Sequence, residues 1–246
     1  MSFNLCIDWG NTLVKAGLFE KGQLTATFSF PAHDAHMRLV DLIDEHKPVY
    51  AVISSVSSKS AEVEDILAAK VKKMIKMTDN TPLPIMNAYS SDNVGADRLA
   101  MAVGAHHANP GKNNLVVCLG TCITYNFVQN TRTFRGGAIS PGLHMRLKAM
   151  HEFTEKLPEV SLDGETLLLG YDTETCMRSG AVFGIMSEID GMVNEFASKY
   201  PHFNAVLTGG DMTYFEGKLK CEIFADPDII LKGLNIILKH NVPQAV

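Results

Sequence analysis

The chain has 246 residues, of which 46% are hydrophobic and 20% charged, a composition typical of a globular protein with one large or two compact domains. A net charge of −5 without any basic block argues against a nucleic-acid partner. The sequence contains neither an apolar run of the about 20 residues that span a bilayer nor a signal-peptide pattern, so we expect a cytoplasmic protein without a membrane segment.

The first half of the chain alternates strand and helix patterns. Three strand-like pieces lie in residues 4–30, separated by the turns "WGN" and "EKGQ". Helical spacing behind the cap candidate Asp34 predicts a helix over 34–46, the run "VYAVISSV" predicts a buried strand, and residues 58–74 predict a second helix. Residues 79–95 carry two prolines and predict a loop, and "ADRLAMAVGAHHA" predicts a third helix.

The turn residues of "NPGKNN" mark a restart of the strand signals. The strand-like pieces "LVVCLG", "CITYNFV" and "TRTFRGGAI" follow it. Helices are predicted over Pro141–Phe153, Glu174–Tyr200 and Asp228–His240, with strands at "FNAVLTGGD" and near Cys221–Phe224. This alternation predicts an α/β fold.

The restart resembles the beginning of the chain. Both "LCIDWGNTLVKAGLF" and "VVCLGTCITYNFV" read as an apolar strand, a turn with glycine and threonine, and a second apolar strand, so that Asp8 and Gly10 align with Cys118 and Gly120. Each is followed by a third strand and then helices. The repeat predicts two similar lobes, 1–109 and 110–246.

The stretch "IDWGNTLVK" has the residues of a phosphate-binding turn. Gly10 permits a tight turn, and the N–H groups there, with the Asn11 and Thr12 side chains, can donate to phosphate oxygens. Lys15 adds a positive charge, and Asp8 can hold Mg²⁺ directly or through water. The alternative is a hairpin without a ligand.

The stretch "VGADRLA" places Gly95 before a helix with Asp97 in its first turn. In a functional site, the N–H groups of the helix start and Arg98 bind an anionic or hydroxylated substrate, and Asp97 accepts a hydroxyl proton during phosphoryl transfer. The alternative is that Asp97 only favours the helix start through the helix dipole and that Arg98 is a surface residue.

Two further glycine motifs, "FRGGAISPGL" and "VLTGGD", allow the backbone to approach a nucleotide closely, with Gly209 in the second. Ordinary turns at strand ends are the alternative for both. The five cysteines form no C-x-x-C pair, and we expect buried thiols in a reducing compartment without a zinc site.

Five motifs, D-x-G-N-T, G-A-D-R, G-T-x-x-T, G-G-x-I-x-P-G and T-G-G, occur in this order along nearly the whole chain. This set resembles the type III pantothenate kinases of the acetate/sugar kinase, heat-shock chaperone and actin superfamily. The resemblance implies two ribonuclease-H-like lobes of the actin-like ATPase fold, with ATP in the cleft between them. It also implies phosphorylation of pantothenate to 4′-phosphopantothenate, the first step of coenzyme A biosynthesis.

The resemblance also implies roles for single residues. Asp97 matches the general base. The positions matching ATP contacts are Asp8, Gly10, Asn11, Thr12, Lys15, Gly120, Thr121 and Gly209. The positions matching substrate contacts are Tyr89, Gly95, Ala96, Asp97, Arg98 and Thr173, with the Tyr89 spacing to Gly95 one residue short. Thr173 matches a contact that the family supplies across a homodimer interface.

The second phosphate motif departs from the family at two positions. The family's aspartate there is associated with a monovalent cation, typically potassium, and this chain has Cys118 instead. A neutral thiol is a poor ligand for a hard cation. A second family aspartate corresponds to Asn126. The cation site is therefore absent, or is held by backbone carbonyls alone, or catalysis itself is impaired.

The departure leaves three functions open. The first is an active pantothenate kinase with an altered cation requirement. The second is a non-catalytic relative that binds nucleotide or pantothenate, because a fold alone does not establish an activity. The third is a kinase for another small hydroxylated substrate.

Overall fold

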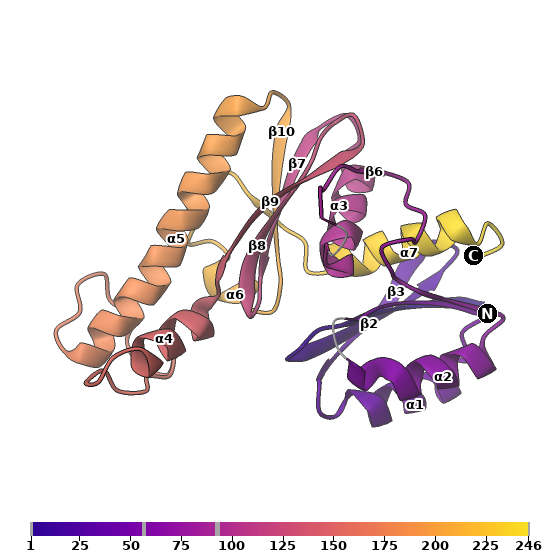
Figure 1. Ribbon diagram of the computed structural model, residues 1–246, viewed down its shortest axis with the longest axis horizontal. Helices are drawn as coiled ribbons and strands as arrows, with labels where there is room; N and C mark the ends of the chain where they lie inside the picture. Colours follow the sequence, from indigo (N-terminus) through magenta and orange to yellow (C-terminus); the bar gives the residue numbers. More distant parts are fainter. Residues whose placement is uncertain (1, 56–57, 92–93, 246) are drawn as a thin grey trace. The chain divides into compact units, whose positions relative to one another are not determined.

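The computed structural model describes residues 2–55, 58–91 and 94–245 (Figure 1). Two compact units make up the chain. The first comprises Met1–Asn114, Asn126–Gly136 and Asp228–Val246, and the second comprises Leu115–Tyr125 and Gly137–Pro227. The predicted lobe boundary at residue 109 rests on the motif repeat and stays a prediction.

The first unit contains a five-stranded mixed sheet in the order β3-β2-β1-β4-β5. Strands β1 (Phe3–Trp9), β2 (Leu13–Glu20) and β3 (Gln23–Pro31) pair antiparallel as two successive hairpins. Strand β4 (Tyr50–Ser55) is parallel to β1, and β5 (Lys73–Lys76) is parallel to β4. The sheet therefore combines hairpins with crossover connections, as expected of an α/β fold.

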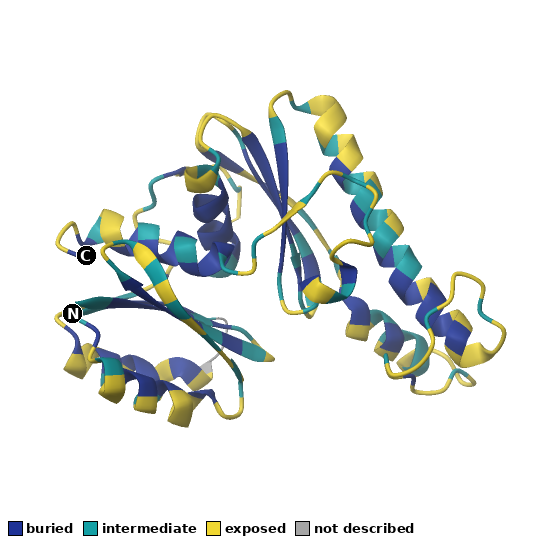
Figure 2. Ribbon diagram, turned by 180° about the vertical axis from the view of Figure 1, so that it is seen from behind, coloured by how far each residue is buried: buried dark blue, intermediate teal, exposed yellow. Residues whose placement is uncertain are grey.

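Helices cover both faces of this sheet (Figure 1). Helices α1 (Ala35–His46) and α2 (Ala61–Lys70), the latter preceded by the short η1 (Ser58–Ser60), pack on one face in a core of apolar side chains. In Figure 2 the sides of α1 and α2 that face the sheet are buried and the opposite sides are exposed. Helix α7 (Ile229–Asn241) covers the other face of β1 and β4.

The α7 face of the sheet is the one that carries Asp8. Asn4 of β1 donates from Nδ2 to Oδ1 of Asn235 on α7, over 3.1 Å. Because strand side chains alternate between faces, Asp8 lies on the same face as Asn4, whereas Leu5 and Ile7 belong to the core under α1 and α2.

Helix α3 (Ala96–Ala108) packs against α7 through glycines. A Cβ on Gly233 would lie 1.8 Å from the carbonyl oxygen of Ala100, and one on Gly104 would lie 2.4 Å from the carbonyl oxygen of Ile229. The two backbones therefore meet without side chains between them. This close crossing fixes α3, and with it the helix start that contains Asp97, within the first unit.

A second sheet has six strands in the order β11-β10-β7-β8-β9-β6. Its strands, in chain order, are β6 (Met86–Asn87), β7 (Asn113–Leu119), β8 (Cys122–Val128), β9 (Thr133–Pro141), β10 (Phe203–Thr208) and β11 (Phe224–Ala225). In the second unit α4 (Leu143–Glu152) packs on the long helix α5 (Thr173–Lys199), which also contacts β10, and the short α6 (Met212–Phe215) follows β10.

Two predicted elements differ from the structure. The helix predicted over 58–74 is wrong beyond Lys70, because Val71 is extended and Lys73–Lys76 forms β5 along the open edge of β4. The loop predicted over 79–95 contains the two-residue strand β6, which is parallel to β9. Val56 of the predicted strand and Asp92 and Asn93 of the predicted loop lie outside the described residues.

Within the described ranges, no helix combines the length and the apolar character needed to cross a membrane.

Candidate functional site

The first candidate phosphate turn joins β1 to β2. The N–H of Gly10 donates to the carbonyl oxygen of Leu13 over 3.1 Å, and a Cβ on Gly10 would lie only 2.8 Å from that oxygen. The carbonyl oxygen of Thr12 accepts the N–H of Ala32 over 2.9 Å, directly after β3 ends. The turn is therefore anchored at both ends, and Asn11 and Thr12 between these anchors are exposed to solvent.

Asp8 lies at the carboxyl end of β1, beside this turn. It is paired in register with Lys15 of β2 and with the buried Ser54 of β4. Burial, and after it the negative charge of Asp97, raise the pKa of Asp8 to about 7, although Lys15 and Ser54 oppose the shift. Asp8 therefore holds a proton far more readily than an exposed carboxyl does.

Asp97 lies in the first turn of α3, directly after the N-terminal residues Gly95 and Ala96. Burial raises the pKa of its carboxyl and outweighs the backbone N–H of Arg98 and the Arg98 charge, which both lower it. A Cβ on Gly95 would lie 2.4 Å from Oδ1 of Asp97, so glycine is needed for the carboxylate to lie over the helix start. Asp8 and Asp97 are thus two perturbed carboxyls within one compact unit.

Arg98 is buried, with 6% of its surface exposed, so the alternative that it is a surface residue is wrong. Its Nε donates to Oδ1 of Asn126 over 2.6 Å. Its guanidinium carbon lies 5.5 Å from the ring centroid of Tyr89 and 5.8 Å from that of Phe134. An amide oxygen and two ring faces therefore orient the cation within the first unit.

The second candidate phosphate turn joins β7 to β8. The N–H of Gly120 donates to the carbonyl oxygen of Cys122 over 3.1 Å, and the carbonyl oxygen of Thr121 accepts the N–H of Gly142 over 3.1 Å. Gly142 directly follows β9, as Ala32 directly follows β3. The two turns therefore share a pattern of anchoring, which confirms the predicted repeat of strand, turn and strand.

Gly209 approaches the second turn within the second unit. Its φ is 103°, and a Cβ there would lie 2.2 Å from the carbonyl oxygen of Leu119, so two independent constraints demand glycine. Asp211, two residues after Gly209, donates its N–H to the same oxygen over 3.0 Å. The T-G-G motif thus rests on the end of β7, directly beside Gly120.

The model of the type III pantothenate kinase family matches residues 4–195. The chain belongs to the type III pantothenate kinase family. The type III pantothenate kinase of Phocaeicola vulgatus is 39% identical over 239 residues, which cover 97% of this chain and 98% of that protein. The type III pantothenate kinase of Bacteroides fragilis is 40% identical over 243 residues, with the same two coverages.

Solved structures share the fold of this pantothenate kinase family member. A Campylobacter jejuni protein assigned to the Baf family of transcriptional activators superposes with a TM-score of 0.60 at 21% identity, over 96% of this chain and 98% of its own. A ROK family glucokinase from Streptomyces griseus gives a TM-score of 0.54 at 12% identity, over 97% and 99%. At these identities the likeness concerns the fold alone, an α/β fold of two similar lobes of the actin-like ATPase type.

The two residues that stand where the family resemblance implies aspartates, Cys118 and Asn126, lie on the neighbouring strands β7 and β8. Cys118 is half-buried near the end of β7, and Asn126 is fully buried on β8 with its amide oxygen engaged by Arg98. None of the described cysteines is in a disulfide. Only Cys6 is buried and Cys176 is exposed, so the expectation of buried thiols is wrong for most of them.

The predicted site residues form one group in the first unit and another in the second unit. The first unit brings Asp8, Lys15 and Asp97 into one electrostatic cluster. The second unit brings Gly120 next to Gly209 through the end of β7. Thr173 is the exposed first residue of α5, where Asp172 forms a capping box with Thr175.

Two contacts of the site were missed from the sequence. Ser54 supplies a buried hydroxyl beside Asp8, and its only signal is a polar residue inside the apolar run "AVISS". Phe134 lies near Arg98, and nothing in its local pattern distinguishes it from a core residue.

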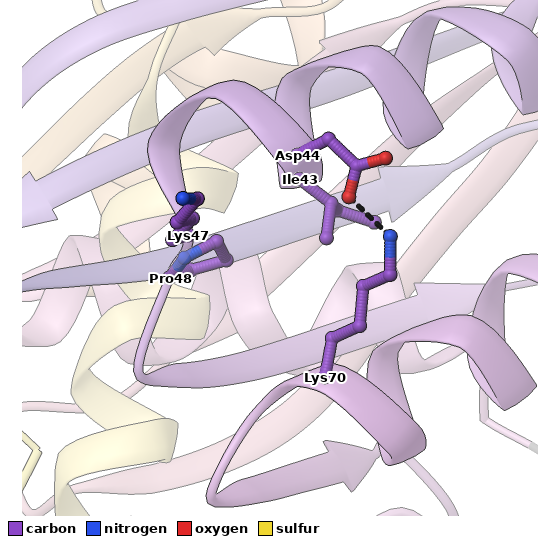
Figure 3. A pocket seen from close by; sticks show the side chains of 5 residues that line it. All are labelled: Ile43, Asp44, Lys47, Pro48 and Lys70. Carbon is purple, nitrogen blue, oxygen red and sulfur yellow. Dashed lines mark hydrogen bonds and ion pairs between the residues drawn. The ribbon is translucent and has the colours of Figure 1, made fainter.

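The structure also has a surface pocket whose lining residues differ from the predicted site residues. Figure 3 shows its walls, formed by Ile43, Asp44, Lys47, Pro48 and Lys70, with Lys70 paired to Asp44. None of the predicted site residues lines it, so we do not assign it to the reaction.

Proposed function

We propose that this protein transfers the γ-phosphate of ATP to the primary hydroxyl of pantothenate, giving 4′-phosphopantothenate as the first step of coenzyme A biosynthesis. Membership of the pantothenate kinase family supports the reaction. The observation that carries the proposal for this chain is the pair Asp8 and Asp97, two carboxyls of one unit whose pKa values are both raised. Perturbed carboxyls of this kind are typical of catalytic sites.

The kinase fold implies ATP and a divalent metal ion, and we propose Mg²⁺ with Asp8 as its protein ligand. Mg²⁺ is commonly bound by one or two carboxylates together with substrate phosphates, so a single half-buried carboxylate beside a phosphate turn fits it. When bound, the ion neutralises charge on the phosphates. A cation beside Asp8 also favours the ionised form of its carboxyl, against the burial that disfavours it.

Backbone and side-chain donors hold the phosphates in this proposal. Gly10, Asn11 and Thr12 supply the first turn and Lys15 a positive charge, while Gly120 and Thr121 supply the second turn. Anchored turns of this kind present N–H groups without a cost of reorganisation during the reaction.

Asp97 acts as the general base. Its carboxylate takes the proton of the pantothenate hydroxyl while the hydroxyl oxygen bonds to the γ-phosphorus. The bond between the γ-phosphorus and the bridging oxygen breaks, and ADP leaves with that oxygen. The raised pKa of Asp97 suits the role, because a base is most effective when its pKa approaches the working pH.

Arg98, Tyr89 and the Gly95–Ala96 helix start bind the substrate. Pantothenate carries a carboxylate and hydroxyl groups, and a buried guanidinium held in place by Asn126 is a strong partner for an anion. The ring of Tyr89 lies against the Arg98 guanidinium, so both side chains can contact the same part of the substrate.

We propose a cytoplasmic homodimer, with Thr173 contributed across the interface. Exposed apolar side chains gather before α5 and at the end of α4, with exposed fractions of 88% for Phe153, 76% for Leu168, 86% for Leu169 and 71% for Tyr171. Such side chains are typical of a protein interface, and a second copy of this chain is the occupant that the position of Thr173 favours.

A potassium site does not fit the residues of this chain. Cys118 offers a thiol where a hard cation needs oxygen, and the amide oxygen of Asn126 already accepts from Arg98. We therefore propose that turnover does not depend on potassium.

A coupled assay of ADP formation with ATP, Mg²⁺ and pantothenate, run with and without potassium, tests the proposal. We expect pantothenate-dependent turnover in both conditions. An absence of turnover under every cation condition would contradict it. If calorimetry then detected binding of ATP or pantothenate, the non-catalytic relative would be the better interpretation, and turnover with other hydroxylated substrates only would favour a different kinase.

A further inference from the structure

A half-buried ion pair outside the predicted site lies close to the second candidate phosphate turn. We propose that Arg146 of α4 and Glu188 of α5 are positioning residues that fix the Gly120–Thr121 turn for the phosphates of ATP. This inference rests on the proposed function, in which that turn binds phosphate. All of the contacts involved belong to the second unit.

The Glu188 carboxylate is the central acceptor of a hydrogen-bond network, called here the Glu188 hub. Its Oε1 accepts the hydroxyl of Tyr125 over 2.9 Å and that of Ser140 over 2.5 Å, and its Oε2 accepts Nη2 of Arg146. Tyr125 lies on β8, which leaves the phosphate turn, and Ser140 lies near the end of β9. One carboxylate of α5 therefore holds β8, which follows the turn, and the end of β9, which the residue Gly142 joins to the turn.

Arg146 extends the hub to the turn itself. Its Nε donates to the carbonyl oxygen of Pro141 over 2.9 Å, and its backbone N–H donates to the carbonyl oxygen of Gly142 over 2.9 Å. The N–H of Gly142 in turn donates to the carbonyl oxygen of Thr121. A chain of hydrogen bonds thus runs from Glu188 through Arg146 to the residue that closes the turn.

The contact between Gly142 and the Gly120–Thr121 turn is so close that a shift of the Gly142 backbone would move the turn. A Cβ on Gly142 would lie 2.2 Å from the carbonyl oxygen of Gly120 and 2.6 Å from that of Thr121. The Pro141–Gly142 backbone therefore lies directly against the turn. If this backbone shifts, the turn loses its support.

The pair remains intact over the working pH range. Burial raises the pKa of Glu188, but the hydrogen bonds from Ser140, Arg146 and Tyr125 outweigh it, so its pKa lies below the ordinary value. Burial and Glu188 raise the pKa of Tyr125, which keeps its hydroxyl a donor. The side chains of Arg146 and Glu188 are only 22% and 25% exposed, so solvent screens the pair weakly.

The test compares Arg146→Met and Glu188→Gln with Glu195→Gln. Glu195 lies on the same helix in an ion pair with Lys199 whose side chains are both 62% exposed, so it serves as a matched control. We expect the KM for ATP to rise about tenfold or more in the first two variants, because each loses a charge-assisted hydrogen bond. The KM for pantothenate should stay within about twofold, and Glu195→Gln should match the wild type.

A binding measurement separates positioning from general destabilisation. By calorimetry without pantothenate, Glu188→Gln should weaken ATP binding but leave adenosine binding unchanged, because adenosine carries no phosphate for the turn to hold. Equal losses for ATP and adenosine, or an unchanged KM for ATP, would overturn the proposal. If Arg146→Met does not fold, Arg146→Lys takes its place, since it keeps the charge but loses the Nε donor to Pro141.

Failure of the proposed function gives a different result. A wild-type protein without pantothenate-dependent turnover contradicts the kinase activity, while the calorimetric comparison of ATP with adenosine still decides the role of Arg146 and Glu188. A wild type that turns over pantothenate, together with variants whose ATP and pantothenate constants rise in parallel, contradicts the positioning role alone.

Discussion

Nε of Arg98 donates a 2.6 Å hydrogen bond to Oδ1 of Asn126, and both side chains are buried. The two residues are 28 positions apart, and the amide stands where the family resemblance implies an aspartate. The neutral partner orients the guanidinium without cancelling its charge. A substrate anion can therefore gain from the full charge of Arg98.

Asn126→Ala removes this acceptor from the buried guanidinium. We expect a loss of about 1–3 kcal/mol in the free energy of unfolding, because a buried charged donor loses a hydrogen bond. The KM for pantothenate should rise about tenfold with a smaller change in kcat. Chemical denaturation and steady-state kinetics measure both effects. The exposed Asn80→Ala is the control, and an unchanged KM would remove Arg98 from substrate binding.

Asp97→Asn tests the general base. It keeps the size of the side chain but cannot take a proton, so kcat should fall about 10²–10⁴-fold. Stability should be unchanged or higher, because the variant removes a half-buried charge whose pKa burial has raised. Circular dichroism melting and the coupled assay measure the two effects, with Asp65→Asn on the exposed face of α2 as the control. Near-normal turnover would exclude the role.

Asp8→Asn tests the raised pKa of Asp8 through stability. The folded-state pKa of about 7 exceeds the ordinary aspartate value of 3.8, so the folded state binds the proton more tightly than the unfolded state does. This stabilisation is fully present below pH 3.8 and is lost as pH rises through about 7. The stability of the variant relative to the wild type should therefore rise as the pH increases from about 4 to about 8. Above about pH 8 the difference between the two proteins should stay constant. Denaturation in EDTA across this range measures it, and parallel pH curves would contradict it.

Much of the fold follows from local sequence. The last helix, predicted over Asp228–His240, is observed over Ile229–Asn241, because its apolar spacing and flanking residues act within a few turns. The two turns at Gly10 and Gly120 were also predicted, since glycine and threonine between apolar strands specify them.

Other features depend on packing that no local pattern records. Residues 73–76 have helical composition but form β5, because the free edge of β4 offers them hydrogen bonds. The burial of Arg98 depends on Asn126 and Phe134, which reach it from distant strands. The Glu188 hub likewise joins residues 42–63 positions apart, so a single sequence gives no spacing from which to infer it.

Gly233→Ala tests the close crossing of α3 and α7. The added Cβ would lie 1.8 Å from the carbonyl oxygen of Ala100, so the helices must separate, at an expected cost of about 1–3 kcal/mol or more. Asp97 begins α3, so kcat should fall as well. Gly180→Ala on α5 is the matched control: its Cβ meets nothing within 4 Å, and it should gain about 1 kcal/mol from helix propensity. Equal stability of the two variants in urea denaturation would contradict the crossing.

Cys118→Asp tests the cation requirement. Position 118 lies near the end of β7, two residues before Gly120, and a carboxylate there supplies an oxygen ligand beside the second candidate phosphate turn. We expect the wild type to turn over equally in potassium and in a large organic cation, whereas the variant should be activated by potassium through a lower KM for ATP.

The control for this variant is Cys176→Asp, which adds the same charge at an exposed position of α5 and should leave the cation response unchanged. Rates are compared at constant ionic strength, because screening alone weakens surface charges. If Cys118→Asp and the wild type respond identically to potassium, position 118 is not part of a cation site in this chain. If the wild type itself requires potassium, the ion must be bound by ligands other than Cys118, and the proposal of potassium-independent turnover is wrong.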